Sequence, residues 1–352
     1  MKRYIKNIPN FIFQLSFFNC MLCFMLSGCI EEYVPTRFYE IENILAVDGI
    51  ITDDETYITL SRSTYLTADS YFWEDYITDA KVFVECDDDT FFSSQIVYNN
   101  RGWYSLPQYL IKTGKLDVNK RYRLLIETAN FKYRSEYLYP VITPEIDSIF
   151  WIKNGRGQPV MIYIATQSPE ENILHYRWAI EEDWEVRSFV YHPDYNYYCW
   201  NSNYSGLNIG SAEKRVLGKL TEKILEIHPS NNRLSVMYRI NVKQNAISKK
   251  AYDYFSNIKK NSTNLGGIFA PIPSEMRGNI ICVDDPEKHV IGYIDISTTS
   301  QMQHIITRSH NLYERPWVDC EISEDDDDIS LVCVECTHQG GTLIIPDNWP
   351  PE

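Results

Sequence analysis

The stretch Thr56–Arg62 (TYITLSR) alternates apolar and polar side chains along its length. Alternation at every second residue is typical of a β-strand with one face in a core and the other in water. The same pattern recurs at Lys81–Glu85 (KVFVE) and Tyr122–Glu127 (YRLLIE). Short strands of this kind, separated by turn-forming residues, predict a mainly β fold built as sandwiches or open barrels.

Further strand candidates lie on both sides of these stretches. Pro140 and Pro144 interrupt the series, and Pro lacks the N–H that a strand donates. We therefore expect two β-sandwich-like domains, of the immunoglobulin or fibronectin kind, over residues 41–143 and 144–352. The other candidate strands are Ile44–Val47 with Ile50–Ile51 after a turn at Gly49, Phe91–Tyr98, Tyr133–Tyr137, Ile146–Trp151, Val160–Ala165, Leu174–Glu181, Leu234–Val242 and Val290–Ile296.

One segment of the second domain has helical spacing instead. Residues 248–260 (SKKAYDYFSNIKK) place Ala251, Tyr254, Phe255 and Ile258 on one face, and Ser248 is a suitable N-cap. We expect a helical insertion near 248–260 whose apolar stripe packs on a sheet.

The composition limits the classes of partner. The chain has 352 residues, with 33 Lys and Arg against 48 Asp and Glu, and a formal net charge of −15. Phosphate attraction needs a basic face, so no nucleic-acid partner is expected. The aromatic content of 14% favours strands and surface recognition over helix bundles.

The first 28 residues resemble a lipoprotein signal peptide. Positive residues (Lys2, Arg3, Lys6) precede the apolar stretch 11–26, which is too short and too interrupted to span a membrane. Leu26-Ser27-Gly28-Cys29 resembles a bacterial lipobox, which implies cleavage before Cys29 and lipidation of its thiol and new amine. Two or more acyl chains anchor a protein firmly. The alternative is an ordinary secretory signal whose cleavage site borders a Cys.

Residues 29–40 are expected to form an acidic tether. Glu31 and Glu32, directly behind the lipidated Cys, resemble a surface-export signal of Bacteroidota lipoproteins. We therefore expect a protein anchored by lipid in the outer membrane and facing the cell exterior. The alternative is a plain solvated tether on a protein that faces the periplasm.

Several short motifs follow one another in a fixed order along the chain. They are Val47-Asp48-Gly49, Ala251-Tyr252-Asp253-Tyr254, Gly267, Pro271-Ile272-Pro273, Arg277-Gly278-Asn279-Ile280, Asp285-Pro286-Glu287-Lys288, Val290-Ile291-Gly292-Tyr293, Cys333-Val334-Glu335-Cys336-Thr337, Gly340-Gly341-Thr342, Pro346 and Trp349. In this order they resemble the Bacteroidota lipoprotein family known as domain of unknown function 4249. The resemblance implies an outer-membrane lipoprotein, often encoded beside a TonB-dependent transporter. It implies no reaction.

Six cysteines remain besides the signal and Cys29. In an oxidising compartment thiols pair, so we expect disulfides and a disulfide-stapled C-terminal tail. Cys320, Cys333, Cys336 and His338 could instead hold zinc, but the paired spacing of a zinc ribbon is absent; free thiols are a third possibility. The disulfide candidates are Cys199, Cys282, Cys320, Cys333 and Cys336.

The stretch 191–204 (YHPDYNYYCWNSNY) is rich in Tyr and Trp, which dominate binding hot spots. We interpret it as a loop that binds a partner, with a protein favoured over a glycan. Local packing around Cys199 is the alternative. The binding candidates are Tyr195, Tyr197, Tyr198 and Trp200.

The sequence contains no H-E-x-x-H, G-x-S-x-G or phosphate-loop motif. The acidic runs Asp87–Asp89 and Glu324–Asp328 lack the alternating ligands of a calcium loop, and we interpret them as solvated loops. We expect no catalytic residue, metal or cofactor. The expected function is a non-enzymatic ligand-capture partner of a TonB-dependent transporter. Alternatives are a stand-alone adhesin or glycan-binding lipoprotein and, less favoured, a surface hydrolase.

Overall fold

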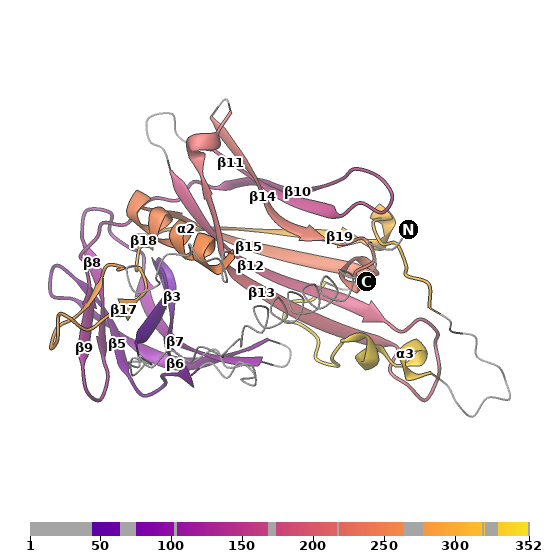
Figure 1. The fold of residues 1–352 in the computed structure, drawn as a ribbon, viewed down its shortest axis with the longest axis horizontal. Coiled ribbons are helices and arrows are strands. Elements are labelled where there is room, and N and C mark those ends of the chain that lie inside the picture. The colour runs from indigo at the N-terminus through magenta and orange to yellow at the C-terminus, as the bar shows by residue number, and fades with distance from the viewer. Residues whose placement is uncertain are drawn as a thin grey trace, which may run out of the picture. The chain divides into compact units, whose positions relative to one another are not determined.

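The computed structural model describes residues 44–63, 75–101, 104–167, 174–216, 218–263, 277–318, 320 and 330–350. Figure 1 shows that strands make up most of this part of the chain, so the predicted mainly β class is confirmed. From Asn43 onward the chain forms one compact unit. The finer expectation of two immunoglobulin- or fibronectin-like sandwiches with a boundary at residues 143 and 144 stays a prediction.

A 10-stranded sheet contains the three alternating stretches. Thr56, Ile58 and Leu60 point into its core and are buried, whereas Tyr57 and Thr59 between them are partly exposed. Buried side chains from neighbouring strands complete this core. The strands are β1 (Leu45–Gly49), β3 (Asp54–Arg62), β4 (Asp75–Tyr76), β5 (Lys81–Cys86), β6 (Phe91–Arg101), β7 (Tyr104–Gly114), β8 (Tyr122–Glu127), β9 (Lys132–Ser135), β16 (Ile280–Cys282) and β17 (Val290–Ile291).

Residues 280–297 return from late in the chain to this first sheet. β16 pairs with β9 and β17 with β1, while β18 (Ile296–Ser297) pairs with β2 (Ile51–Thr52). The predicted single strand Val290–Ile296 is therefore wrong. It breaks at Gly292, whose φ is +144° and where an added Cβ would lie 2.4 Å from the Val47 carbonyl oxygen. Only glycine fits this close crossing.

Two further sheets pack around a second core. Trp178, Tyr176 and Tyr238 are the largest of the fully buried side chains there. The three-stranded sheet consists of β10 (Ile146–Lys153), β11 (Val160–Gln167) and β14 (Lys219–Ile227). The four-stranded sheet consists of β13 (Tyr198–Ser211), β12 (His175–Arg187), β15 (Met237–Ile247) and β19 (Thr299–Thr307), in that order. Short 3₁₀ helices lie at Ala212–Lys214, Asn232–Leu234, Arg308–His310 and Cys336–Gln339.

The predicted helix is confirmed as α2 (Lys249–Thr263). The Ser248 hydroxyl accepts a hydrogen bond from the Ala251 N–H at 3.2 Å, as an N-cap does. The predicted stripe packs beside β13 and β12, together with Ile247 and Tyr293 (Figure 1). A second, short helix, α3 (Leu331–Val334), lies in the C-terminal segment. Among the described residues, no helix is long and apolar enough to cross a membrane.

Candidate functional site

The face of the four-stranded sheet that points away from its core carries polar side chains. On β12, Arg177, Ala179 and Glu181 alternate with the buried core residues Trp178 and Ile180. The register continues the pattern across the neighbouring strands. Asn245 and Thr299 lie in line with Arg177, and Lys243 and Gln301 lie in line with Ala179.

A cavity of about 490 Å³ lies between this polar face and the outward face of β1 and β3 in the first sheet. We call it the polar cleft. Tyr57 and Tyr204 contribute aromatic rings, and Asn99, Gln108, Asn245 and Gln301 contribute amides. Its charged lining residues are Asp48, Asp53, Asp54, Glu55, Glu181, Arg177 and Lys243. Because carboxylates outnumber cations, the cleft disfavours an anionic ligand.

Arg177 joins the two walls of the polar cleft. Its Nη2 donates to the Asp48 carboxylate at 2.8 Å, and its Nε donates to the Gly206 carbonyl at 2.8 Å. The guanidinium lies 4.9 Å from the centre of the Phe255 ring of α2. Its Nη1 is buried and has no hydrogen-bond partner among the described residues. A buried donor without a partner is costly.

Glu181 and Tyr57 face the cleft from opposite walls. Glu181 accepts from the Asn241 amide at 2.8 Å and from Lys243 at 3.3 Å. The Tyr57 hydroxyl donates to Glu55 at 2.8 Å. Burial, that hydrogen bond and the charges of Glu55 and Glu181 raise the pKa of Tyr57 to about 12. The phenol therefore stays protonated, and the cleft offers fixed donors and acceptors suited to hydroxyl groups.

The predicted aromatic loop is only partly a loop, because β13 begins at Tyr198. Tyr195 packs on His192 with ring centres 5.1 Å apart, and Tyr197 packs edge-on against Tyr198 at 4.9 Å. Trp200 exchanges backbone hydrogen bonds with Thr342 at 2.8 and 2.7 Å. None of these four candidates lines the polar cleft.

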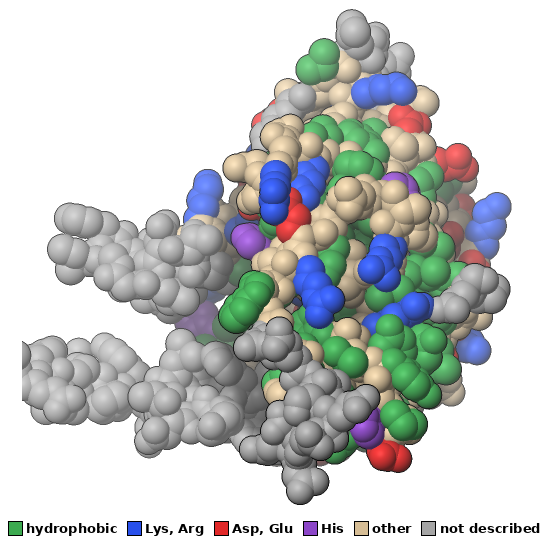
Figure 2. Space-filling model, turned by 90° about the vertical axis from the view of Figure 1, so that its right-hand side faces the viewer, with side chains coloured by type: hydrophobic (Ala, Val, Ile, Leu, Met, Phe, Trp, Pro, Cys, Tyr) green, Lys and Arg blue, Asp and Glu red, His purple; other side chains and the backbone are tan. Residues whose placement is uncertain are grey.

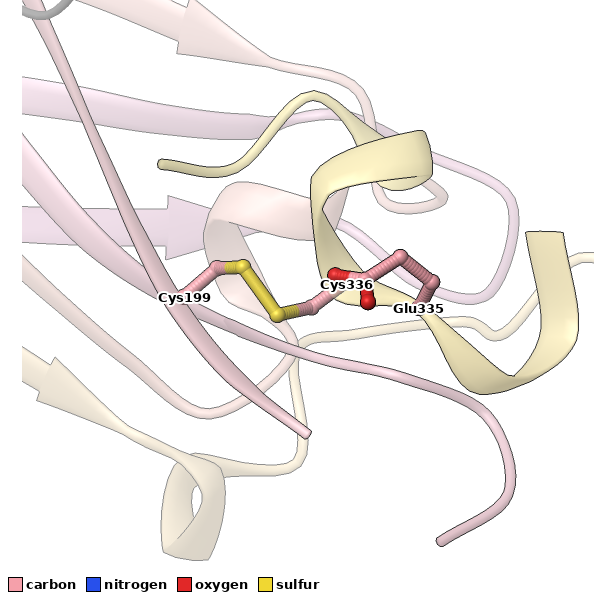
Figure 3. Close-up of side chains that lie close together, drawn as sticks. All are labelled: Cys199, Glu335 and Cys336. Carbon is pink, nitrogen blue, oxygen red and sulfur yellow. A yellow bond between two sulfur atoms is a disulfide. The ribbon is translucent and has the colours of Figure 1, made fainter. Parts of the chain in front are cut away.

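The predicted disulfides are confirmed, and the structure selects the partners. Cys199 bonds Cys336 and Cys320 bonds Cys333. The first bond fastens the start of β13 to the segment after α3 (Figure 3). The predicted disulfide-stapled C-terminal tail is thus present.

Cys282, the fifth candidate, is not in a disulfide; it and Cys86 are buried free thiols. Cys86 lies opposite Tyr122 of β8, while Cys282 lies opposite Tyr133, which pairs with Ile126 of β8. The two thiols therefore lie three strands apart across the sheet, which is about 14 Å, and four residues apart along the strands, which is about 13 Å. A disulfide needs Cα atoms less than about 7 Å apart.

The donor atoms of Cys199, Glu335 and Cys336 lie together, as a metal site requires (Figure 3). The two sulfurs are bonded to each other, however, and a thiolate is the form that binds metal. The alternative zinc set of Cys320, Cys333, Cys336 and His338 is likewise wrong, because its three thiols are all in disulfides.

The Glu335 carboxylate holds the C-terminal segment instead. It accepts hydrogen bonds from the backbone and side chain of Asn196 at 3.0 and 3.1 Å, and from Thr337. Burial acts to raise the pKa of Glu335, but these hydrogen bonds outweigh it and lower the pKa.

The acidic run Asp87–Asp89 forms a turn in which Asp87 and Asp88 are paired with basic side chains. Lys120 contacts Asp88 at 2.6 Å and Arg121 contacts Asp87 at 3.0 Å. The other sequence-predicted sites, Cys29, Glu31, Glu32 and the run Glu324–Asp328, lie outside the described residues.

A model of the family described as Domain of unknown function (DUF4249) matches residues 30–303. The chain belongs to the DUF4249 family. None of the curated proteins matches the chain. The DUF4249 match contains every residue that lines the polar cleft, and it ends before the disulfide-bonded C-terminal segment.

Proposed function

We propose that this DUF4249 protein is a non-enzymatic, lipid-anchored outer-membrane protein that faces the exterior and captures a ligand for a TonB-dependent transporter. The observation that carries the proposal is the polar cleft. Its volume of about 490 Å³ falls in the range of small-molecule sites. Two ion pairs, Arg177 with Asp48 and Lys243 with Glu181, hold charged groups of its lining in place, which suits a preformed binding site.

The lining favours a ligand rich in hydroxyl groups and without negative charge. Amide, carboxylate and phenol groups form the hydrogen bonds that hydroxyls accept and donate. Tyr57 and Tyr204 provide ring faces beside them. In the described part of the chain, the buried Nη1 of Arg177 has no hydrogen-bond acceptor. A neutral oligosaccharide has this chemistry.

The proposed anchor and tether support delivery to a neighbouring transporter. A lipid at Cys29 would confine the protein to two dimensions and raise its effective concentration there. Large apolar side chains exposed near the C-terminus offer a surface for a protein partner. Among them, Trp317 is 88% exposed and Ile344 is 69% exposed.

A calorimetric titration of the protein with a panel of neutral oligosaccharides tests ligand capture. Gln301 and Gln303 both lie exposed on β19, but only Gln301 lines the polar cleft. For any saccharide that binds, loss of one hydrogen bond in Gln301→Ala should weaken binding about five- to tenfold. Gln303→Ala should bind as the wild type does. Equal effects of both substitutions would exclude the cleft as the site.

Fractionation and copurification test the anchor and the partner. We expect the mature amino terminus to be a lipidated Cys29, and Cys29→Ser to appear outside the membrane fraction. Gentle solubilisation of native membranes should recover a TonB-dependent transporter with the wild-type protein. Recovery of the protein alone, or with an unmodified amino terminus, counts against this part of the proposal.

Two rival functions predict different results from the same titration. A stand-alone adhesin or glycan-binding lipoprotein would bind the saccharide yet copurify with no transporter. A hydrolase would cleave it, with Glu55 and Glu181 as the acids to test, because both act on the same Tyr57 phenol. Chromatography of the saccharide after incubation separates binding from cleavage.

A further inference from the structure

A second cavity, of about 270 Å³, lies at the end of the four-stranded sheet where β12 finishes. Segments far apart in the chain meet there: the loop after β12, residues 232–236, residues 308–315 and Gln339. Three arginines, Arg187, Arg308 and Arg315, line it, and none of the described lining residues is acidic. In a chain with a net charge of −15, such a concentration of positive charge is unexpected.

Two of the three arginines are oriented by neighbouring side chains. The Arg187 Nε donates to the buried Glu185 at 2.5 Å, and its guanidinium lies over the Tyr198 ring at 5.0 Å. Arg315 lies over the Phe189 ring at 4.6 Å. Stacking on a ring orients a guanidinium and does not neutralise it.

Arg308 and Arg315 form no ion pair with any other residue in the part of the chain described. The nearby carboxylate of Glu314 is committed elsewhere, to Lys153 at 2.7 Å and to the Gly157 N–H at 2.8 Å. Figure 2, which looks onto this end of the unit, shows Lys and Arg side chains set among hydrophobic ones. Glu185 pairs with Arg187, so the uncancelled positive charge of the cavity comes from Arg308 and Arg315.

Neutral hydrogen-bond donors and aromatic rings complete the walls. Asn232, Asn311 and Gln339 line the cavity with the rings of Tyr197 and Tyr313. The Asn232 amide donates to the Gln339 carbonyl at 2.8 Å, which joins two of the wall segments. The Cys199–Cys336 disulfide and a hydrogen bond from the Val190 N–H to the Cys333 carbonyl at 2.9 Å fasten the remaining wall.

We propose that this arginine pocket binds the oxyanion group of a small ligand, a phosphate or sulfate, free or as an ester on a sugar. The planar fork of arginine matches such oxygens with two hydrogen bonds at once. The site has the opposite charge preference from the polar cleft and shares no lining residue with it. It therefore takes a chemically different ligand or a different part of one.

Calorimetric titration at constant ionic strength tests the proposal, with inorganic phosphate, inorganic sulfate and glucose 6-phosphate as probes. At least one probe should bind saturably, and the double substitution R308Q/R315Q should weaken it about tenfold or more. Arg134 provides the matched control. It is exposed on β9 in the first sheet and forms no ion pair with another described residue, so R134Q should bind as the wild type does.

Three results would overturn the proposal: no saturable binding of any probe, an unchanged affinity in R308Q/R315Q, or an equal loss in R134Q, which would indicate general surface attraction. R315K keeps the charge without the fork and should lose at least about threefold, which gives a reading if the double variant does not fold. Tighter binding of glucose 6-phosphate than of inorganic phosphate identifies a site for an ester, and equal binding identifies a site for the free anion. Both of these results support the proposal. Q301A should leave these affinities unchanged, so the two sites can fail independently.

Discussion

Glu182 shows how a single buried charge organises the second core. Its side chain is fully buried and accepts hydrogen bonds from Arg233, Tyr238 and Asn203, each at 2.8 Å. Burial and the charge of Glu182 raise the pKa of Tyr238 well above its ordinary value, so the phenol remains a donor. The carboxylate thus satisfies three groups at once.

We expect Glu182→Ala to lower the free energy of unfolding by about 3–5 kcal/mol, because it leaves buried donors and Arg233 without their acceptor. Its neighbour Glu181 points to the polar cleft on the opposite face of β12. Glu181→Ala should cost about 1 kcal/mol or less, as a partly exposed pair does. Urea unfolding measures the free energy of unfolding of both variants, and equal losses would contradict the hydrogen-bond network assigned to Glu182.

Glu335 gives the C-terminal segment a pH dependence. Its folded pKa lies below the ordinary value of 4.5, so the stabilisation is fully present above pH 4.5 and is lost as the pH falls through the lower, folded pKa. We expect the wild type to melt at a higher temperature than Glu335→Gln at pH 7. The gap should narrow as the pH falls below 4.5. A constant gap down to pH 3 would show that the hydrogen bonds of Glu335 are not the cause.

At the scale of elements, periodicity predicted the strands that have a single buried face. Thr56–Arg62 and Tyr122–Glu127 lie within β3 and β8 because their alternation matches a one-sided core. β7 was not predicted because it contains Pro107, and proline is unfavourable inside a sheet. The structure tolerates Pro107 because it pairs with β6 only, beyond the end of the pairing between β3 and β7. β13 was missed because its residues are polar and partly exposed on both faces, so no alternation marks it.

Helix α2 has local signals strong enough to predict its start. Loss of the N-cap in Ser248→Ala should reduce the stability by about 1 kcal/mol. Ser256 lies inside the same helix, and Ser256→Ala should be neutral or slightly stabilising because Ala favours a helix interior. Thermal unfolding of the two variants compares them directly. A larger loss in Ser256→Ala would mean that the Ser248 cap does not support α2.

For the whole molecule, the pairing of residues 280–297 with the first sheet bears on the predicted boundary at 143. Near that boundary the Val141 N–H donates to the Ile296 carbonyl at 2.9 Å, and the Gln244 amide donates to the Pro144 carbonyl at 2.9 Å. A fragment of residues 41–143 lacks β16, β17 and β18.

We expect this fragment to be unfolded alone and to fold when residues 144–352 are supplied as a second chain. The NMR dispersion of the isotope-labelled fragment, alone and after mixing, is the measurement. Cooperative folding of 41–143 by itself would establish it as an independent domain.

The two cavities lie beyond the reach of local sequence patterns. Asp48 appears only within a family motif and Arg177 only within the candidate strand Leu174–Glu181, and the sequence assigns neither a role. Their contact joins positions 129 residues apart. The arginine pocket likewise combines four separate segments, each of which carries one to three polar residues with no distinguishing motif. The order of charged and polar residues along the chain does not show which of these segments meet in the fold.

The crossing at Gly292 has a consequence for how the protein matures. The ribosome synthesises the chain amino end first, so β1 is available long before its partner β17. Contacts such as that between Asp53 and Thr299, 246 residues apart, form only after both segments have been synthesised. Until then the edge of β1 that β17 later covers stays open, and an open strand edge promotes aggregation during folding.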